Sequence, residues 1–243
     1  MSKNEKDFRI HGLVCTYNDL ATLPLCIDSL RDVCDSVIVA DGAYQKYYEN
    51  YLKFDKNVKP YSTDGTLEML EVFKKKMPLQ VINCPDGKPW VNQVQKRTAL
   101  LDAIPVKDWF VILDSDEMFY GNIVEGINEV MSSGCIQGHV PLYNVGLDVS
   151  GLIMFWHPRI FLKLPGMHYE RKHWLICDFA HRVVEETYPS WGVDKFVLAH
   201  FKVFRHHRRL APHLQYMNDM GKDGWLEPES HMFKTEDESE VNA

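Results

Sequence analysis

The sequence contains no uninterrupted apolar run approaching the length of a membrane-spanning helix, which needs about 20 residues. Its start, Met-Ser-Lys-Asn-Glu-Lys-Asp, has no apolar stretch, so we expect no secretory signal. Positive charge is also in deficit, because 27 Lys and Arg stand against 34 Asp and Glu and give a net charge of −7. A broad nucleic-acid surface would need a basic face. These absences predict a protein with no transmembrane segment and no nucleic-acid partner.

The sequence also lacks any C-x-x-C pair, although it contains six cysteines. They are scattered through apolar runs, so we interpret them as buried free thiols of a reducing compartment. The cysteines are Cys15, Cys26, Cys34, Cys84, Cys135 and Cys177. We therefore expect a cytoplasmic protein, and the sequence leaves its oligomeric state open.

No internal repeat divides the chain, and 45% of its 243 residues are hydrophobic. This length and composition predict one large folded domain over residues 1–243 and exclude general disorder. We divide the expected domain into a first half, 8–120, and a second half, 121–220. The acidic residues 235–243 are predicted to be a frayed tail.

Apolar runs alternate with amphipathic stretches in the first half. Short β-type runs predict strands over 8–16, 36–40, 79–83 and 109–113. Helical spacing predicts helices over 23–34, 66–77 and 90–104, the first with Thr22 as its N-cap. Alternation of this kind predicts an α/β fold with a mainly parallel sheet covered by helices on both faces.

The pattern changes beyond Gly134, where short β-type runs are separated by glycine and proline. We expect these runs to be antiparallel additions to the sheet. They cover 136–143, 152–156, 160–164 and 196–201. A helix with a basic start is expected over 205–220, broken or kinked by Pro212.

Polar residues follow each strand of the first half, at the edge where parallel sheets bind ligands. The most informative are Asp114, Ser115 and Asp116. In a regular strand the two carboxylates would point to opposite faces, but a turn that begins there would bring both toward one ligand. Hard oxygen ligands suit Mg²⁺ or Mn²⁺ carrying a diphosphate. The alternative is an ordinary solvated turn.

Five short motifs, in order over residues 8 to about 120, resemble family 2 glycosyltransferases of the GT-A fold. They are T-Y-N at 16–18, a strand ending in Asp41, S-T-D-G-T at 62–66, K-R-T-A-L at 96–100 and D-S-D-E at 114–117. The resemblance implies a GT-A-like, Rossmann-type central sheet whose first half binds a nucleotide sugar. Residues 43–61 depart from the family as an insertion, which we expect to fold over the nucleotide or to contact an acceptor.

The resemblance also implies a transferase, hexosyltransferase-like, that moves sugar from a UDP- or GDP-sugar to a hydroxyl of a glycan or another acceptor. Donor-binding roles fall on residues of the strand ends and of the helix over 90–104. Thr16, Tyr17 and Asn18 would line the nucleoside pocket, and Asp41 would accept a hydrogen bond from the base or ribose. Lys96 and Arg97 would approach the base or diphosphate. Asp114 and Ser115 would contact the ribose or the metal. Asp116 would bind Mn²⁺ or Mg²⁺ as part of a D-x-D motif.

The second half resembles one branch of the same enzymes through Pro158–Leu162 and a later histidine. By this resemblance His200 would complete the metal shell beside Asp116. The alternative is a core histidine at a strand end. The branch has a His-Glu pair where this chain has His173-Trp174, so its glutamate is missing.

An inverting transfer needs a carboxylate to deprotonate the acceptor hydroxyl. Asp178, which follows an apolar run, is the preferred catalytic base, and Glu185 is the second candidate. The basic residues 205–209 would be a phosphate clamp or a solvated helix face. A retaining enzyme and a catalytically silent nucleotide-sugar-binding module stay open as alternatives. A sugar-1-phosphate nucleotidyltransferase would need a G-x-G-x-x-R-x-x-P-K loop after the first strand, and residues 16–19 do not supply it.

Overall fold

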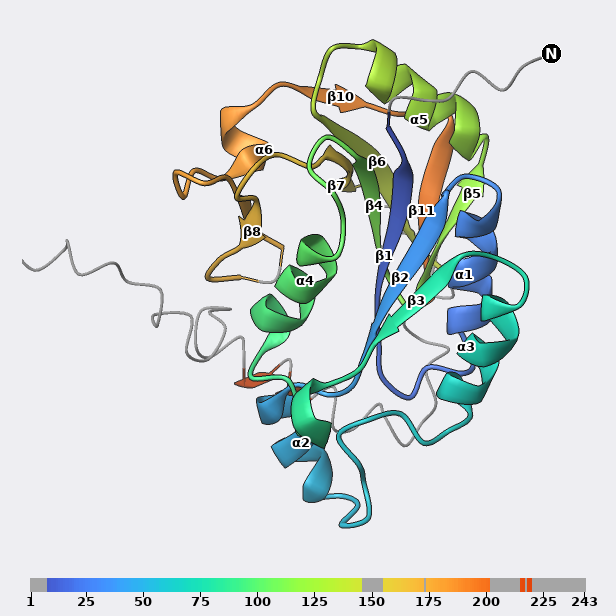
Figure 1. The fold of residues 1–243 in the computed structure, drawn as a ribbon, viewed down its shortest axis with the longest axis vertical. Coiled ribbons are helices and arrows are strands. Elements are labelled where there is room, and N and C mark those ends of the chain that lie inside the picture. The colour runs from blue at the N-terminus through green and yellow to red at the C-terminus, as the bar shows by residue number, and fades with distance from the viewer. Residues whose placement is uncertain (1–7, 146–154, 173, 202–214, 217, 220–243) are drawn as a thin grey trace, which may run out of the picture.

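A parallel sheet forms the first half of the fold in the computed structural model, which describes residues 8–145, 155–172, 174–201, 215–216 and 218–219 (Figure 1). Its strands are β1 (Ile10–Thr16), β2 (Ser36–Asp41), β3 (Leu79–Ile82) and β4 (Trp109–Asp114), in the order β3-β2-β1-β4. Thr16 lies opposite Asp41, and Cys15 lies opposite Asp114. The register therefore brings the carboxyl ends of β1, β2 and β4 to one edge.

The second half extends this sheet beyond β4. The added strands are β7 (Phe155–Leu162), β6 (Gln137–Asn144), β11 (Phe196–His200) and β5 (Glu117–Gly121), with β10 (Ser190–Gly192) beside β6. Strand β7 is antiparallel to β4 and β6, whereas β11 is parallel to β6 and antiparallel to β5. The predicted fold class, a mainly parallel sheet flanked by helices with antiparallel additions, is confirmed.

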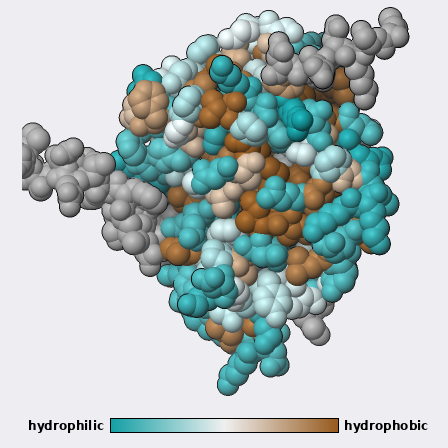
Figure 2. Space-filling view, in the orientation of Figure 1, coloured by the Kyte–Doolittle hydropathy of each residue, from teal (hydrophilic) through white to brown (hydrophobic). Residues whose placement is uncertain are grey.

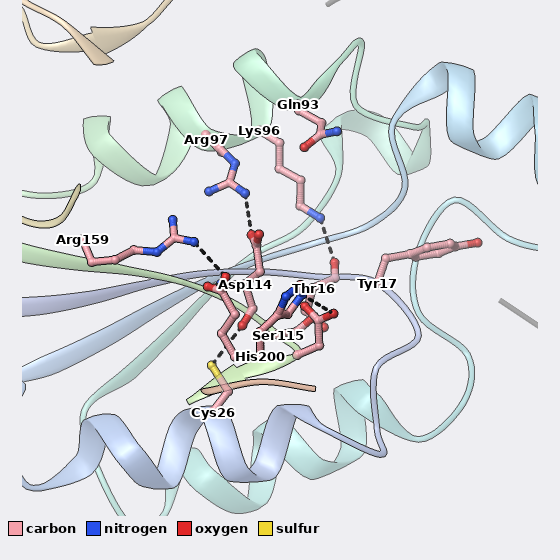
Figure 3. Close-up of polar contacts among 12 residues, drawn as sticks. Thr16, Tyr17, Cys26, Gln93, Lys96, Arg97, Asp114, Ser115, Arg159 and His200 are labelled. Atoms are coloured by element: carbon pink, nitrogen blue, oxygen red, sulfur yellow. Dashed lines mark hydrogen bonds and ion pairs between the residues drawn. The ribbon is translucent and has the colours of Figure 1, made fainter. Parts of the chain in front are cut away.

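Helices cover both faces of the sheet because neighbouring strand residues point to opposite sides. In β2, Val37 and Val39 join the apolar cluster under α1 (Leu23–Arg31), α3 (Thr66–Lys74) and α5 (Ile123–Ser132). Ile38 and Ala40 join the cluster under α4 (Gln93–Asp102) and α6 (Val184–Thr187). The Lys96 and Arg97 side chains of helix α4 extend toward the edge where the parallel strands end (Figure 3).

Two smaller elements lie beside this core. Helix α2 (Gln45–Leu52) follows the carboxyl end of β2, and a ribbon of β8 (His168–Tyr169) and β9 (Ile176–Cys177) packs against α4. A short 3₁₀ turn, η1 (Pro85–Gly87), follows β3. Figure 2 shows apolar patches between wider hydrophilic areas on the face drawn in Figure 1. Within the described part of the chain, none of the helices combines the length and apolar character that a bilayer crossing demands.

Several element predictions are corrected by the structure. The helix expected from residue 90 begins at Gln93, because the Asn92 side chain accepts the Gln95 N–H at 2.8 Å. The runs expected at 152–156 and 160–164 are joined in β7, which continues through Pro158. A β-bulge between Gly138 and His139 lies opposite this proline, which has no N–H to pair. Strand β5 and helix α5 were not predicted. Residues 205–209, most of the helix expected over 205–220, and the acidic tail lie outside the described residues.

Candidate functional site

The candidate site lies where β1, β2 and β4 end, and it is reached from the other side by β7 and β11 (Figure 3). Strand β4 ends at Asp114, a turn holds Ser115 and Asp116, and β5 begins at Glu117. This turn separates the two aspartates of the tripeptide, and each has a different partner.

Asp114 is paired with Arg97 of α4. The Arg97 guanidinium donates from Nη2 to Asp114 Oδ1 in a close ion pair. Burial lowers the pKa of Arg97, but Asp114 and neighbouring groups together raise it, and the pKa lies well above its usual value. The Asp114 side chain is 34% exposed, whereas that of Arg97 is 7% exposed. A carboxylate that a ligand can reach therefore stands beside a permanently charged guanidinium.

Asp116 is paired with His200, which ends β11. Asp116 is 1% exposed, and its Oδ2 lies 3.3 Å from His200 Nε2. His200 Nδ1 donates to Asn144 Oδ1 at 2.9 Å, so Nε2 is the ring atom directed at the carboxylate. Burial lowers the pKa of His200, and the Asp116 contact raises it above its usual value. The two predicted metal ligands that lie 84 positions apart in the sequence are thus adjacent.

The donor set matches a hard divalent ion, since it offers carboxylate oxygens and one imidazole nitrogen. Among the described residues, however, the side chains of Asp114, Asp116 and His200 do not form a group whose ligand atoms all lie within 4.8 Å. Asp116 and His200 fit a metal ion as a pair, and Asp114 contacts Arg97 instead. The assignment of these residues as metal ligands stays a prediction.

Glu117 and Arg159 complete this side of the site and were not among the predicted site residues. Arg159 Nη2 donates to Glu117 Oε1 at 2.7 Å, and the Asp114 N–H donates to Glu117 Oε2 at 2.8 Å. Both side chains are largely buried, with Glu117 3% and Arg159 14% exposed. The D-S-D-E and P-R-I-F patterns contained this pair, but nothing in the sequence places the two residues in contact.

Lys96 lies beneath the strand ends and is 1% exposed. Its Nζ donates to the Thr16 carbonyl at 2.7 Å (Figure 3). It also donates to the Gly42 carbonyl at 2.6 Å. Burial lowers the pKa of this lysine. Lys96 therefore joins the ends of β1 and β2, and its contact with a base or diphosphate stays a prediction.

We predict that Lys96→Met lowers the free energy of unfolding by about 1–3 kcal/mol, because two buried charge-assisted hydrogen bonds are lost. Methionine matches the lysine stem as far as Cε and lacks only the ammonium, so the loss mainly reports the ammonium rather than a large cavity. Urea denaturation measures the change, with the exposed Lys88→Met as the matched control. Equal stability of the two variants would contradict a joining role for Lys96.

The loop over 62–63 is held by Asp41 and Asn18, two residues that were predicted to contact the nucleotide of the sugar donor. Asp41 accepts the Ser62 N–H at 3.0 Å and the Ser62 hydroxyl at 2.5 Å. Asn18, in the left-handed region with φ 50°, donates its N–H to Ser62 Oγ at 2.7 Å and accepts the Thr63 N–H at 2.8 Å. These contacts shape the strand-end edge, and the hydrogen bond that Asp41 would accept from a nucleotide and the contact of Asn18 with it stay predictions.

Tyr17 connects the same edge to the insertion over 43–61. Its hydroxyl donates to the Lys59 carbonyl at 2.6 Å. Its ring meets those of Tyr47 and Tyr51 edge to face, with centroids 5.9 and 6.3 Å apart. Helix α2 of the insertion is therefore packed on a tyrosine cluster beside β1. Whether the insertion covers a nucleotide or contacts an acceptor stays a prediction.

Ser115 and Thr16 are both buried. Ser115 donates its hydroxyl to the carboxylate of Asp19, which was not among the predicted site residues. The Asp19 N–H in turn donates to Thr66 Oγ1 at 3.1 Å. Thr16 Oγ1 has no hydrogen-bond partner within the described residues. The Thr66 hydroxyl of the S-T-D-G-T motif is thus used to fix the turn after β1.

The two candidate bases lie on the α4 side of the sheet rather than in the turn after β4. Asp178 accepts hydrogen bonds from the Ala180 N–H at 2.9 Å, the Arg182 N–H at 3.0 Å and the Tyr188 hydroxyl at 2.9 Å. Arg182 Nε donates to it as well, at 2.9 Å. Burial raises the pKa of Asp178, but these donors hold it well below its usual range. Glu185 is exposed on α6.

No family model and no curated protein matches this chain. Residues 1–349 of TarS from S. aureus, solved in complex with UDP-GlcNAc, are 17% identical with a TM-score of 0.45, covering 59% of this chain and 37% of that one. The same TarS fragment in complex with UDP gives the same identity and score. A putative glucose-1-phosphate thymidylyltransferase from Bacillus anthracis is 12% identical with a TM-score of 0.38, covering 88% and 84%. The aligned part of this chain spans less than two fifths of the TarS fragment.

Proposed function

We propose that this chain is a metal-dependent glycosyltransferase that moves a sugar from a UDP- or GDP-sugar to a hydroxyl of a glycan or another acceptor. One observation supports this most strongly. The Arg97–Asp114 and Asp116–His200 pairs lie together at the edge where parallel strands end, which is where such sheets bind nucleotides. The five glycosyltransferase-like motifs converge on the same edge.

The donor's diphosphate needs positive charge at this edge, and two sources are proposed. Arg97 keeps its charge and stands beside the partly exposed Asp114. Asp116 and His200 would hold Mn²⁺ or Mg²⁺, which when bound stabilises the negative charge on the leaving diphosphate. Glu117 is neutralised by Arg159, so it adds little negative charge to the place where the diphosphate would lie.

The acceptor would approach from the second half of the chain. We propose an inverting transfer in which a carboxylate takes the proton of the acceptor hydroxyl, with Asp178 and Glu185 as candidates. The donors around Asp178 make it a weak proton acceptor, since an efficient base has a pKa near the working pH. These contacts favour a positioning role for Asp178. A retaining mechanism remains the alternative.

Two other classes are separated from this proposal by specific features. A silent nucleotide-sugar-binding module would bind donor without turnover, and the missing glutamate after His173 favours it. A nucleotidyltransferase would cleave between phosphates, but the loop after β1 lacks the glycine-rich basic sequence such an enzyme needs. The cytoplasmic location and the division into halves at residue 120 remain predictions from the sequence.

Nucleotide sugars with Mn²⁺ are expected to raise the melting temperature. A donor present at 100 times its dissociation constant would stabilise the fold by about 2.7 kcal/mol. A thermal-shift screen of UDP- and GDP-sugars, each with Mn²⁺ and with a chelator, measures this. The chelator is expected to remove most of the shift. If no nucleotide sugar stabilises the protein in either condition, the proposed function is wrong.

A further inference from the structure

A second group of metal-ligating side chains lies on the β8–β9 ribbon. His168, Glu170 and His181 each offer one ligand atom, and these atoms all lie within 4.8 Å of one another. Glu170 Oε2 is 3.4 Å from His168 Nε2 and 2.8 Å from His181 Nδ1. No residue of this group takes part in the site proposed above.

The backbone presents these three side chains together. His168 and Glu170 alternate with Tyr169, so both emerge on the face opposite the buried tyrosine. His181 has a left-handed φ of 58°, a conformation that is uncommon for residues other than glycine. The turn that contains it is held by Asp178, which accepts the N–H groups on both sides, from Ala180 and Arg182. The fold thus fixes His181 against Glu170 at the cost of a strained residue.

The hydrogen bonds of His168 direct its Nε2 at the Glu170 carboxylate, whose other oxygen, Oε1, lies 3.4 Å from Arg171 Nε. His168 Nδ1 lies 2.9 Å from the Gly166 carbonyl, which can only accept, so Nδ1 carries the hydrogen. In a neutral ring Nε2 would then direct its lone pair at the Glu170 carboxylate, which also only accepts. A proton or a metal ion resolves this conflict. A histidine that donates one ring N–H to a backbone carbonyl and directs the other nitrogen outward is the usual arrangement of a metal ligand.

We propose that His168, Glu170 and His181 bind a divalent transition metal, Zn²⁺ by preference, with water in the fourth position. Two imidazoles and one carboxylate form a set that Zn²⁺ takes with an open position, whereas Mg²⁺ and Mn²⁺ favour oxygen-rich sets. Glu170 is largely buried and His181 is half exposed, so an ion can enter from solvent and still contact a fixed carboxylate.

The ion would also secure the neighbouring part of the candidate site. Tyr169, between the two proposed ligands, packs its ring against the Arg97 guanidinium at 6.0 Å and donates its N–H toward Thr98 Oγ1 at 3.4 Å. A metal that clamps His168 and Glu170 to His181 would hold this tyrosine against α4. The inference does not depend on the proposed sugar transfer, because metal binding is measured without a donor.

Equilibrium dialysis of the chelator-stripped full chain, without a histidine tag, against Zn²⁺ tests the proposal. At least one equivalent of zinc is expected to be retained. His181→Gln, whose exposed ring can change with little effect on folding, is expected to weaken binding at this group at least about 100-fold. His139→Gln removes a histidine of β6 in the main sheet, away from the β8–β9 ribbon, and Asp116→Asn alters the other proposed metal site. Both are expected to retain zinc, so failure here is distinguishable from failure of the proposed function.

Cobalt gives an independent readout of the ligands. Co²⁺ in this site is expected to show the visible absorption of a four-coordinate ion, and the absorption is expected to disappear in Glu170→Gln. The spectrum should lack a sulfur charge-transfer band, although Cys177 lies opposite His168 in the ribbon. The proposal is overturned if the unaltered chain retains no more zinc than His181→Gln, or if the cobalt spectrum contains the sulfur band.

Discussion

Asp116→Asn is expected to lower the rate of sugar transfer by about 10²–10³-fold or more, the scale of losing one group that stabilises charge in the transition state. Asparagine has the shape of aspartate but not the charge that a divalent ion requires. The side chain is buried at the turn after β4, and it contacts His200, the other proposed ligand. A transfer assay with Mn²⁺, together with nucleotide binding with and without the ion, measures the change.

Asp86→Asn is the matched control for this variant. Asp86 also follows a strand, is exposed, and has a left-handed φ of 51° that asparagine tolerates. It is expected to transfer sugar at the normal rate. His200→Ala is expected to weaken metal binding less than Asp116→Asn, because one ligand of several is lost. Near-normal transfer by Asp116→Asn in the presence of a chelator would end the metal hypothesis.

If Asp178 is the catalytic base, Asp178→Asn is expected to cut sugar transfer by about 10²-fold or more, the scale of a lost general base, while donor and metal binding are retained. The structure adds that the variant should also have a lower melting temperature, since four hydrogen bonds end on this carboxylate. Rates and melting curves of the purified variant measure both effects.

Variants of two neighbouring residues distinguish a positioning role of Asp178 from a role as the catalytic base. Arg182→Gln removes the guanidinium, whose Nε and Nη2 lie 2.9 and 2.7 Å from Asp178 Oδ2, and Tyr188→Phe removes the hydroxyl donor. Both variants leave the Asp178 carboxylate in place. If Asp178 only positions the segment over 178–188, both variants lose part of the activity without a change in the pH profile of the rate. If it is the base, only Asp178→Asn loses the acidic limb of the profile. Normal turnover by Asp178→Asn with loss in Glu185→Gln would move the role to Glu185.

The parallel half of the fold was predictable because its strands are buried on both faces and appear as continuous apolar runs. The strand-end motifs then placed Asp41 and Asp114 at one edge without structural data. Strand β5 was missed because it follows β4 after only a two-residue turn and is partly exposed, with Tyr120 69% exposed. Local pattern does not show that β11 would pair with β5 on one side and β6 on the other.

The partners within the site were harder to predict than its location. The sequence indicated that Lys96 and Arg97 reach the strand ends. It did not indicate that the Lys96 ammonium donates hydrogen bonds to two backbone carbonyls. Asp178 followed an apolar run as expected, yet its four donors come from residues further along the chain. Contacts of this kind depend on the tertiary path of loops, which hydrophobic periodicity does not encode.

The central claim is that the edge formed by β1, β2 and β4 supports cleavage of a nucleotide sugar, and product analysis tests it most directly. The protein is incubated with Mn²⁺ and a UDP- or GDP-sugar that stabilises it, and the products are identified by NMR and chromatography. We predict release of the nucleoside diphosphate with the sugar passed to an acceptor or to water, at a rate lowered at least about 10²-fold in Asp116→Asn. An intact donor, or release of a nucleoside monophosphate by cleavage between the phosphates, would contradict the account.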